Sequence, residues 1–353
     1  MKAEHTSVPG LNRGAAAALG AAILFGIGTP FAKLLLGETS PWLLAGLLYL
    51  GSGIGLLVLR LLRRSPAVRL PRVETAWLLG AVVTGGMIAP VLLMWGLASM
   101  PASGASLLLN AEAVFTALIA WFVFRENFDA RIAVGMALIV AGAIVLSWSG
   151  GTDPGTLLPA LSVLAACLAW GVDNNLTRKV SLADATFIAM VKGLVAGTVN
   201  LVLALVLGAR LPAPETIFAA GAIGFVSYGL SLVLFVIALR YVGTARTGAY
   251  FSTAPFAGAL LAVVMLDEPA TLQLMVAGAL MAGGVWLHLT ERHEHRHIHE
   301  ALDHEHEHVH DAHHQHVHPY PVAPGTRHTH GHHHEPLAHV HSHFPDAHHR
   351  HEH

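Results

Sequence analysis

The sequence predicts an all-α, polytopic membrane protein: ten transmembrane helices form two inverted five-helix repeats, followed by a disordered His-rich C-terminal tail. Three observations support this prediction. The chain is 54% hydrophobic and only 12% charged, whereas a soluble domain carries about 25% charged residues. Ten apolar stretches lie between residues 14 and 289, and 24 of the 26 histidines come after them.

Each apolar stretch is long enough to cross a hydrocarbon layer of ~30 Å, which takes about 20 helical residues. Helices are expected because a single segment in lipid must satisfy its own backbone hydrogen bonds. The expected spans are 14–36, 41–62, 75–98, 101–124, 130–149, 157–177, 184–207, 216–239, 244–266 and 270–289. We therefore expect an N-terminal segment (1–13), a first repeat (14–149), a second repeat (150–290) and a tail (291–353).

The positions of Lys and Arg predict the orientation, because cytoplasmic loops carry an excess of them. With a cytoplasmic N-terminus, the outer loops hold only Lys33 and Arg210. The inner segments then hold Lys2, Arg13, Arg60, Arg63, Arg64, Arg69, Arg72, Arg125, Arg131, Arg178, Lys179, Arg240 and Arg246. We expect a multi-pass protein of the plasma (bacterial inner) membrane, with the lipid bilayer as its surroundings and both termini in the cytoplasm.

The two halves of the apolar region resemble each other. A shift of 142 residues aligns Glu126 with Glu268 and Gly142 with Gly284, and a shift of 145 aligns Phe25-Gly26 with Trp170-Gly171. Two copies of five spans must cross the membrane in opposite directions, because five is odd. Inverted repeats are a common construction of secondary transporters.

These motifs resemble the EamA family of the drug/metabolite transporter superfamily. The resemblance rests on Phe25-Gly26 with Lys33, on Trp170-Gly171 with Arg178, and on the corners Arg125-Glu126 and Asp267-Glu268-Pro269. It covers residues 14 to 289 and leaves the tail outside. The resemblance implies a secondary carrier, often an exporter of amino acids, metabolites or drugs, and it does not indicate which substrate is carried.

Charged residues inside the spans are candidate substrate or coupling residues, because a charge at mid-bilayer costs roughly 2.5–3.5 kcal/mol on insertion scales. Glu112, close to Asn110, is expected to bind a cationic substrate or the coupling proton; the alternative is a protonated carboxyl hydrogen-bonded to a neighbouring helix. Asp173 and Asn174 indicate either a locally opened helix or a wet helix end. Lys192 is expected to pair with Asp173, as a structural lock or as a gate, unless it snorkels to the surface.

Aromatic residues near these positions are expected to line the central cavity, because their faces suit organic substrates and cations. The candidates are Trp170, Tyr250 and Trp95.

The tail is rich in metal ligands and poor in large apolar residues, which predicts disorder without metal. The candidate ligands are His293, His295, His297, His299, His304, His306, His308, His310, His314, His316 and His318. The alternation returns at His328, His330 and His332, at His339, His341 and His343, and at His349, His351 and His353. Neutral imidazole binds zinc, nickel, copper and cobalt, so we expect the tail to bind such ions. In an extended chain residues i and i+2 share a face.

The functional prediction is a secondary transporter, in the export direction, for a small metabolite, amino acid or drug, with a metal-binding tail. The alternatives are a transporter of a transition metal or its chelate, a metal-regulated carrier, and a membrane metal sensor that transports nothing. No nucleotide-binding Gly-Lys loop is present, so neither an enzyme nor ATP-driven transport is expected, and transport should need no cofactor. Cys167 is the single cysteine, which excludes an intrachain disulfide. Nothing indicates a nucleic-acid partner, and the oligomeric state stays open, with a homodimer among the alternatives.

Overall fold

The computed structural model of the chain describes residues 9–124, 130–147, 154–290, 294–299, 302–308, 328–334 and 337–342. Two units are distinguished, Met1–Glu291 and Arg292–His353. We describe each unit by itself.

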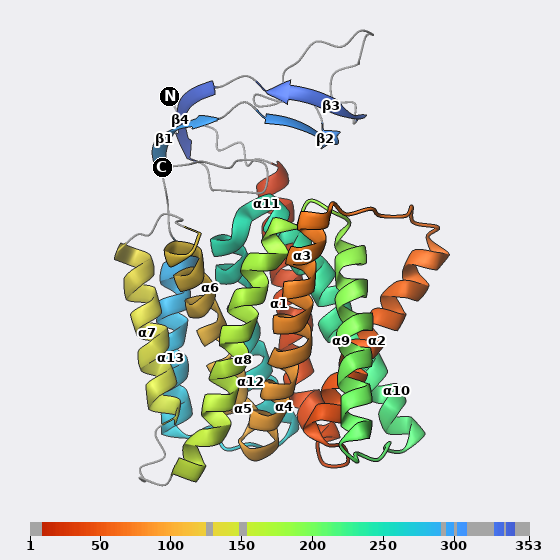
Figure 1. The fold of residues 1–353 in the computed structure, drawn as a ribbon. Coiled ribbons are helices and arrows are strands. Elements are labelled where there is room, and N and C mark those ends of the chain that lie inside the picture. The colour runs from red at the N-terminus through yellow and green to blue at the C-terminus, as the bar shows by residue number, and fades with distance from the viewer. Residues whose placement is uncertain are drawn as a thin grey trace. The chain divides into compact units, whose positions relative to one another are not determined.

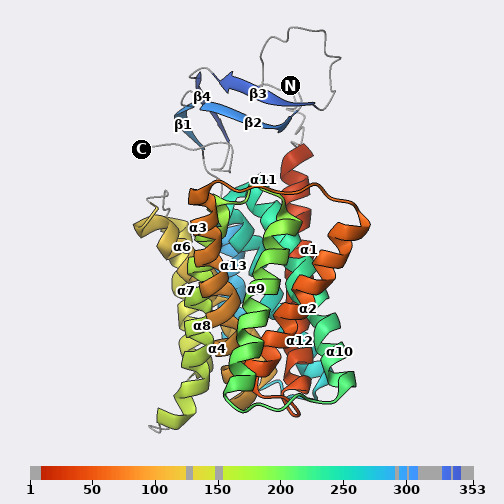
Figure 2. The same ribbon diagram turned by 45° about the vertical axis from the view of Figure 1, so that its right-hand side comes forward.

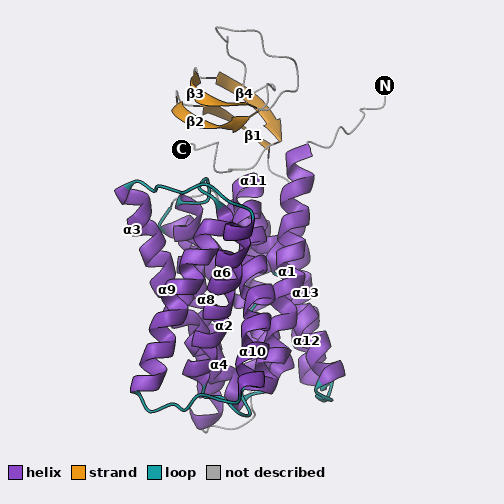
Figure 3. Ribbon diagram, turned by 90° about the vertical axis from the view of Figure 1, so that its right-hand side faces the viewer, coloured by secondary structure: helices purple, strands orange, loops and turns teal. Residues whose placement is uncertain are grey.

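The first unit is a bundle of helices that run in alternating directions (Figure 1, Figure 3). Its elements are α1 (Pro9–Leu35), α2 (Pro41–Leu62), α3 (Arg72–Ala81), η1 (Val82–Ile88), α4 (Ala89–Ser99), α5 (Ala102–Leu108), α6 (Ala111–Phe122), α7 (Ala130–Ser147), α8 (Pro154–Lys179), α9 (Ala185–Val206), α10 (Pro214–Ile223), η2 (Gly224–Leu230), α11 (Ser231–Phe251), α12 (Ala254–Met265) and α13 (Leu272–Leu289). Within the described residues ten helical spans are long and apolar enough to cross a membrane, from Arg13–Leu35 to Leu272–Leu289. Their bounds lie within a few residues of the predicted spans.

Local sequence explains where several helices begin. The side chain of Asp184 accepts a hydrogen bond from the backbone N–H of Phe187, at 2.7 Å, and Thr271 accepts one from Leu274, at 3.1 Å. Ser40 does the same for Leu43, at 3.4 Å, with Pro41 in the first turn of α2. Such side chains satisfy backbone donors that have no partner inside the helix.

Two spans contain π-helical segments at corresponding positions of the two repeats. The third span runs through α3, η1 and α4, and the eighth runs through α10, η2 and the first part of α11. The seven residues of η1, Val82–Ile88, correspond one by one to those of η2, Gly224–Leu230, after the same shift of 142 residues that aligns Glu126 with Glu268.

The fourth and ninth spans are interrupted near their middle. The interruption in the fourth span lies at residues 109–110, between α5 and α6, and that in the ninth lies at residues 252–253, between α11 and α12. Pro255 occupies the first turn of α12, where its missing N–H leaves no hydrogen bond unmade. The sixth span was predicted to open at Asp173 and Asn174 or to have a wet end there; instead α8 is a continuous helix through both residues, and both are buried.

Glycines bring α2 and α9 into close contact. A methyl group added to Gly193 would lie 2.5 Å from the backbone nitrogen of Gly53, and one added to Gly46 would lie 2.7 Å from that of Leu201. The two helices are neighbours in Figure 1 and Figure 2. Small residues permit this backbone approach, which favours helix association in lipid.

The outer faces of the bundle carry large apolar side chains. Ile23, Leu158, Phe218 and Leu260 are each more than half exposed, as expected of side chains that contact lipid chains. The unit therefore has an apolar exterior, and its buried charged side chains lie between helices.

In the second unit, the structure forms two separate two-stranded antiparallel sheets. β1 (Glu294–His299) pairs with β4 (Leu337–Ser342), and β2 (Leu302–His308) pairs with β3 (His328–His334). The prediction that the tail is disordered without metal is not confirmed and stays a prediction. The alternation of His with other residues has the period of a strand, two residues, which is compatible with this conformation. His293, His310, His314, His316 and His318 lie outside the described residues.

Candidate functional site

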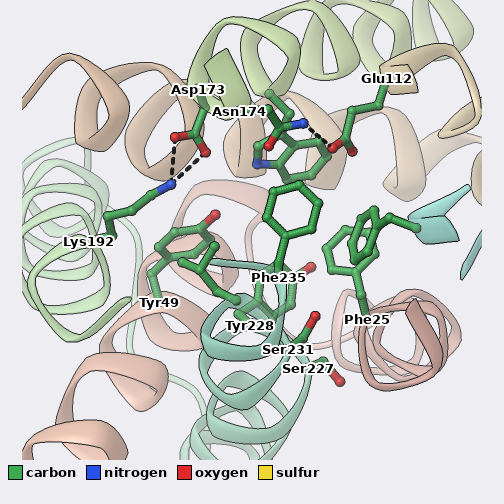
Figure 4. Close-up of a pocket in the computed structure, with 13 residues that line it drawn as sticks. Phe25, Tyr49, Glu112, Asp173, Asn174, Lys192, Ser227, Tyr228, Ser231 and Phe235 are labelled. Carbon is green, nitrogen blue, oxygen red and sulfur yellow. Dashed lines mark hydrogen bonds and ion pairs between the residues drawn. The ribbon is translucent and has the colours of Figure 1, made fainter. Parts of the chain in front are cut away.

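A central cavity in the first unit combines buried charges with aromatic rings (Figure 4). Its lining comes from both halves of the chain: Phe25, Tyr49, Glu112, Trp170, Asp173, Asn174, Lys192, Ser227, Tyr228, Ser231, Leu232, Phe235 and Phe251. Residues contributed by seven of the ten spans meet here, which makes this cavity the candidate substrate site.

Lys192 and Asp173 form a closed ion pair on one side of the cavity. The Lys192 Nζ atom lies 2.6 Å from each carboxylate oxygen of Asp173. The hydroxyl of Thr177, one turn further along α8, donates to Asp173 at 2.8 Å. Lys192 is 1% exposed and Asp173 is 4% exposed. This confirms the predicted pairing, and Lys192 does not snorkel to a surface.

Glu112 lies on the other side of the cavity, in the first turn of α6. One of its oxygens accepts a hydrogen bond from the Asn174 side chain at 2.8 Å, and Asn174 also donates to Thr116 at 3.1 Å. The described part of the chain places no Lys, Arg or His in an ion pair with Glu112. Glu112 lines both the central cavity and a smaller adjoining one, so it is the carboxyl without a cationic partner in this site.

The aromatic wall is held together by ring contacts centred on Phe25. The Phe25 ring lies edge-on to Trp170 at 5.8 Å and to Tyr228 at 5.7 Å, and 5.2 Å from Phe251, measured between ring centres. Edge-to-face and tilted ring pairs stabilise a structure by more than the burial of their apolar surface alone. Phe25 and Trp170 are the two aromatic residues of the repeated aromatic-Gly motif, so both copies of the motif meet at this wall.

The π-helical segment η1 supplies backbone acceptors beside the cavity. The Gly85 carbonyl accepts hydrogen bonds from the Tyr49 hydroxyl, at 2.7 Å, and from the Trp170 indole N–H, at 3.0 Å. Asn200 donates to the carbonyls of Gly86 and Met87, at 3.3 and 3.1 Å. π-Helical turns are frequent at functional sites, and this one fixes two cavity side chains.

Two contacts of the π-helical segments correspond under the repeat. A methyl group at Gly85 in η1 would collide with the Asp173 carboxylate in α8, and one at Gly28 in α1 would lie 2.7 Å from Ser227 in η2. Shifts of 142 and 145 residues carry Gly85 to Ser227 and Gly28 to Asp173. The contact between η1 and α8 therefore has an equivalent in the other repeat, the contact between η2 and α1.

Charged side chains connect helices at both ends of the bundle. We call these ends the Pro9 end and the Leu35 end, after the first and last residues of α1. At the Leu35 end, Lys33 donates to the carbonyls of Leu97 and Met100, at 2.6 and 3.0 Å. The Glu268 carboxylate accepts from the N–H groups of Ala102 and Ser103, at 2.6 and 2.8 Å. These charges complement the dipoles of the helix ends that they contact.

At the Pro9 end, Arg60 forms an ion pair of 2.7 Å with Asp184. Arg240 donates to the backbone carbonyls of Ser181 and Ala183, at 3.0 and 2.6 Å. Both arginines thus hold the short segment between α8 and α9. Arg125 and Glu126, predicted as a corner of the first repeat, lie outside the described residues.

Of the candidates predicted from the sequence, Glu112, Asp173, Asn174, Lys192 and Trp170 are among the residues that line the central cavity. Three others are placed elsewhere. Trp95 is 58% exposed and lines a pocket at the Leu35 end. Tyr250 packs against Ala17, Ala18, Ala238 and Val242.

Asn110 is buried at the interruption of the fourth span, where its side chain donates to the Leu107 carbonyl at 3.1 Å. An aromatic or hydroxyl side chain in an apolar span carries no signal of the face on which it lies. The cavity lining therefore also contains residues that were not predicted, namely Tyr49, Phe235, Phe251, Ser227 and Ser231.

Among the described side chains, no group of three or more His, Cys, Asp or Glu residues is arranged to hold a metal ion. In the described spans the only histidine is His288, whose ring nitrogen lies 3.2 Å from the Ile132 carbonyl. The central cavity offers two carboxylates, one of which is already engaged on both oxygens by Lys192.

The fold and the cavity define a polytopic helical membrane protein with a charged, aromatic-lined centre. The chain belongs to the EamA-like transporter family, whose model matches residues 12–148 and again residues 157–290. Members of this family are transporters, not enzymes, and the chain thus contains two copies of the family's unit.

Similar proteins agree with this assignment. The chain is 32% identical over 288 residues to an uncharacterized transporter of Methanothermobacter thermautotrophicus, a match that covers 76% of this chain and 83% of that protein. It is 31% identical over 231 residues to a probable terminal-alkyne amino-acid exporter of Streptantibioticus cattleyicolor, covering 62% and 75%. A solved structure shares the fold with a TM-score of 0.63 at 21% identity, covering 77% of this chain and 95% of that one.

Proposed function

We propose that the protein is a secondary exporter of small organic molecules and that the central cavity is its substrate site. The observation that carries this proposal is the Glu112 carboxyl, which lies without a cationic partner in an aromatic-lined cavity near the middle of the bundle. A buried carboxylate with no counter-charge is unfavourable by several kcal/mol. Glu112 therefore holds either a proton or the cationic group of a substrate, and exchange between the two couples transport to the proton gradient.

Alternating access between two inverted repeats is the proposed mechanism. Each match to the family model contains five spans, and an odd number reverses the direction of the second copy. The corresponding π-helical segments and their equivalent contacts, Gly85 with Asp173 and Gly28 with Ser227, support this symmetry. Interrupted helices, as in the fourth and ninth spans, commonly line transporter sites.

The substrate proposed for this cavity has an apolar or aromatic body and an amino group. The rings of Phe25, Trp170 and Tyr228 suit the body, and Glu112 suits the amino group. The similarity to a probable amino-acid exporter supports the same class. We further propose that the protein lies in the plasma membrane with both termini in the cytoplasm, and that the tail binds transition-metal ions.

A metal carrier is the second candidate, and the cavity supports it less. Its two carboxylates lie on different sides, and Lys192 already neutralises Asp173. We therefore assign metal to the tail, as a regulator of the carrier, rather than to the transport path.

The first experiment compares growth of a deletion strain and an overexpressing strain on apolar amino acids, aromatic amines, drugs and metal salts. The compound against which overexpression protects is then followed in proteoliposomes that contain the purified protein. The wild-type protein is expected to exchange that compound for protons, and Glu112→Gln is expected to abolish proton-driven transport.

Glu215→Gln is the matched control, because Glu215 is an exposed carboxylate in the first turn of α10. It should transport like the wild type. Unchanged and equally pH-dependent transport by Glu112→Gln would remove Glu112 from the mechanism.

A further inference from the structure

A smaller cavity adjoins the central one, and the two share part of their walls. Four residues line both cavities: Phe25, Glu112, Asn174 and Phe251. The rings of Phe25 and Phe251 lie 5.2 Å apart, measured between their centres. The side chain of Asn174 donates to Glu112 at 2.8 Å, the bond marked beside Glu112 in Figure 4. The Glu112 carboxyl therefore borders both spaces.

The two cavities offer different chemistry. Beyond the shared residues, the central cavity adds aromatic rings such as that of Trp170, whereas the smaller cavity adds the hydroxyls of Thr116 and Ser252. The Thr116 hydroxyl accepts from Asn174 at 3.1 Å, so its own O–H is left to donate. The Ser252 hydroxyl donates to the Gly248 carbonyl at 2.8 Å, so its oxygen is left to accept. Polar groups of this kind can hold a water molecule, which needs two to four such partners.

The smaller cavity extends from Glu112 toward the Pro9 end of the bundle. Thr116 lies one turn further along α6 in the direction of this end, because the Phe124 ring just beyond α6 lies 4.8 Å from the Nζ atom of Lys179, the last residue of α8. Gly248 lies near the start of the ninth span, which begins at the same end. In the proposed orientation this end is cytoplasmic, so the cavity leads from Glu112 toward the cytoplasm.

The internal repeat duplicates the backbone of this region but not its carboxyl. A shift of 142 residues carries Glu112 to Ala254 and Thr116 to Gly258. The second copy is tightly packed at this place, because a methyl group added to Gly258 would lie 2.7 Å from the carbonyl oxygen of Gly26. The copy that carries the carboxyl is therefore the one with a hydroxyl-lined cavity beside it.

We propose that the smaller cavity is a water-holding proton site, through which Glu112 exchanges its proton with the cytoplasm while the substrate occupies the central cavity. This inference rests on the proposed function and adds a proton route that is distinct from the substrate route. Release breaks the O–H bond of the Glu112 carboxyl and forms one on the water held by Thr116 and Ser252, and uptake reverses the step. Transfer over one bridging water is within the reach of a general acid or base.

The other ionisable groups near Glu112 do not take this role. Asp173 and Lys192 neutralise each other at 2.6 Å. The remaining groups are the phenols of Tyr49 and Tyr228 and the thiol of Cys167. Of the described residues that line the smaller cavity, Glu112 alone is ionisable. A proton that arrives through this cavity is therefore held by Glu112.

Three variants of the full-length protein test this route. A methyl group added to Gly248 would meet no atom within 4 Å, so Gly248→Leu extends an apolar side chain into open space of the smaller cavity. Thr116→Val removes a hydroxyl and keeps the shape of the side chain. Gly221→Leu is the matched control, because a methyl group at Gly221 also meets no atom within 4 Å and α10 contributes no lining residue to either cavity.

The first measurement follows proton release. Purified protein in detergent is mixed with 2-phenylethylamine, an aromatic amine of the proposed class, and a pH indicator records the protons released. The wild type should release about one proton per amine bound, because one carboxyl titrates, and Glu112→Gln should release none. Gly248→Leu and Thr116→Val should release the same amount about tenfold more slowly, whereas Gly221→Leu should match the wild type.

The possible outcomes separate this inference from the proposed function. Equal release rates in the wild type and in all three variants would overturn the proton route and leave the proposed function intact. A wild-type protein that binds the amine without releasing a proton would refute exchange on Glu112, and with it both proposals.

A second measurement compares two modes of transport in proteoliposomes. Exchange of labelled for unlabelled 2-phenylethylamine needs no net proton movement, whereas transport driven by a pH gradient does. Gly248→Leu and Thr116→Val should keep exchange within about twofold of the wild type and slow gradient-driven transport about tenfold. Equal losses of both modes in Thr116→Val would place the smaller cavity in the substrate path and overturn the inference.

Discussion

At the scale of single residues, the pair formed by Lys192 and Asp173 controls how much charge the cavity can hold. Both side chains are almost fully buried, and each neutralises the other at 2.6 Å. The net charge of the cavity then depends on Glu112 alone. A substrate that carries a carboxylate would have to compete with Asp173 for Lys192, so we expect amines to bind better than the corresponding amino acids.

Removal of one member of this pair should destabilise the protein strongly. Asp173→Asn leaves the Lys192 charge buried, and Lys192→Met leaves that of Asp173, each with an expected loss of about 3–5 kcal/mol. The double variant should recover most of this loss, because no unpaired charge remains. Thermal unfolding of the purified proteins in detergent measures all three. A double variant as unstable as the sum of the single variants would show that the two charges act independently.

The charged members of the site could be predicted from the sequence, and the neutral ones could not. Glu112, Asp173 and Lys192 stand out because an ionisable group inside an apolar span is costly and usually faces a partner or a cavity. Tyr49, Phe235 and Phe251 reach the cavity only because of the rotation of their helices, which composition does not encode. Trp95 and Tyr250 have the same chemistry, but their positions place them outside it.

At the scale of elements, irregular helices shape the cavity. A regular α-helix uses its carbonyls internally, whereas those of Gly85, Gly86 and Met87 in η1 accept bonds from Tyr49, Trp170 and Asn200. A locally opened helix at Asp173 was one of the two alternatives predicted, but α8 is continuous there. The irregular segments of the third, fourth, eighth and ninth spans were not predicted. Their cause lies in contacts between helices, such as that of Gly85 with Asp173, which no single span reveals.

The contact between α2 and α9 predicts a marked difference between two glycine substitutions. Gly193→Ala puts a methyl group 2.5 Å from the Gly53 nitrogen and should lower the stability by about 1–3 kcal/mol through overpacking. Gly248→Ala in α11 has open space around the added methyl group and should be neutral or slightly stabilising, since Ala favours helix. Thermal unfolding in detergent compares the two. A Gly193→Ala protein as stable as the wild type would show that the helices can separate without loss.

At the scale of the whole molecule, the division into a membrane unit and a tail unit predicts the effect of truncation. Deletion of residues 291–353 should leave the membrane unit inserted and its unfolding temperature unchanged, because its helices end at Leu289. The truncated protein should lose most binding of nickel(II) and zinc(II), measured by equilibrium dialysis. A truncated protein that fails to insert would show that the tail is needed for folding.

The number and bounds of the spans could be predicted from hydropathy because lipid imposes one length on every crossing helix. The internal similarity was also visible, since Phe25-Gly26 and Trp170-Gly171 take equivalent places in the cavity wall. In the tail, composition predicted disorder. The pairing of the strands could not be predicted, because several His-rich segments have similar sequences and any of them could pair.

The close contact of α2 with α9 has a consequence for how such a carrier works. Each of these helices comes from a different half of the gene product, yet their backbones touch at Gly53 and Gly193. We expect two helices interlocked in this way to move together. Under the proposed alternating access, each mobile part of the bundle would then contain helices from both repeats.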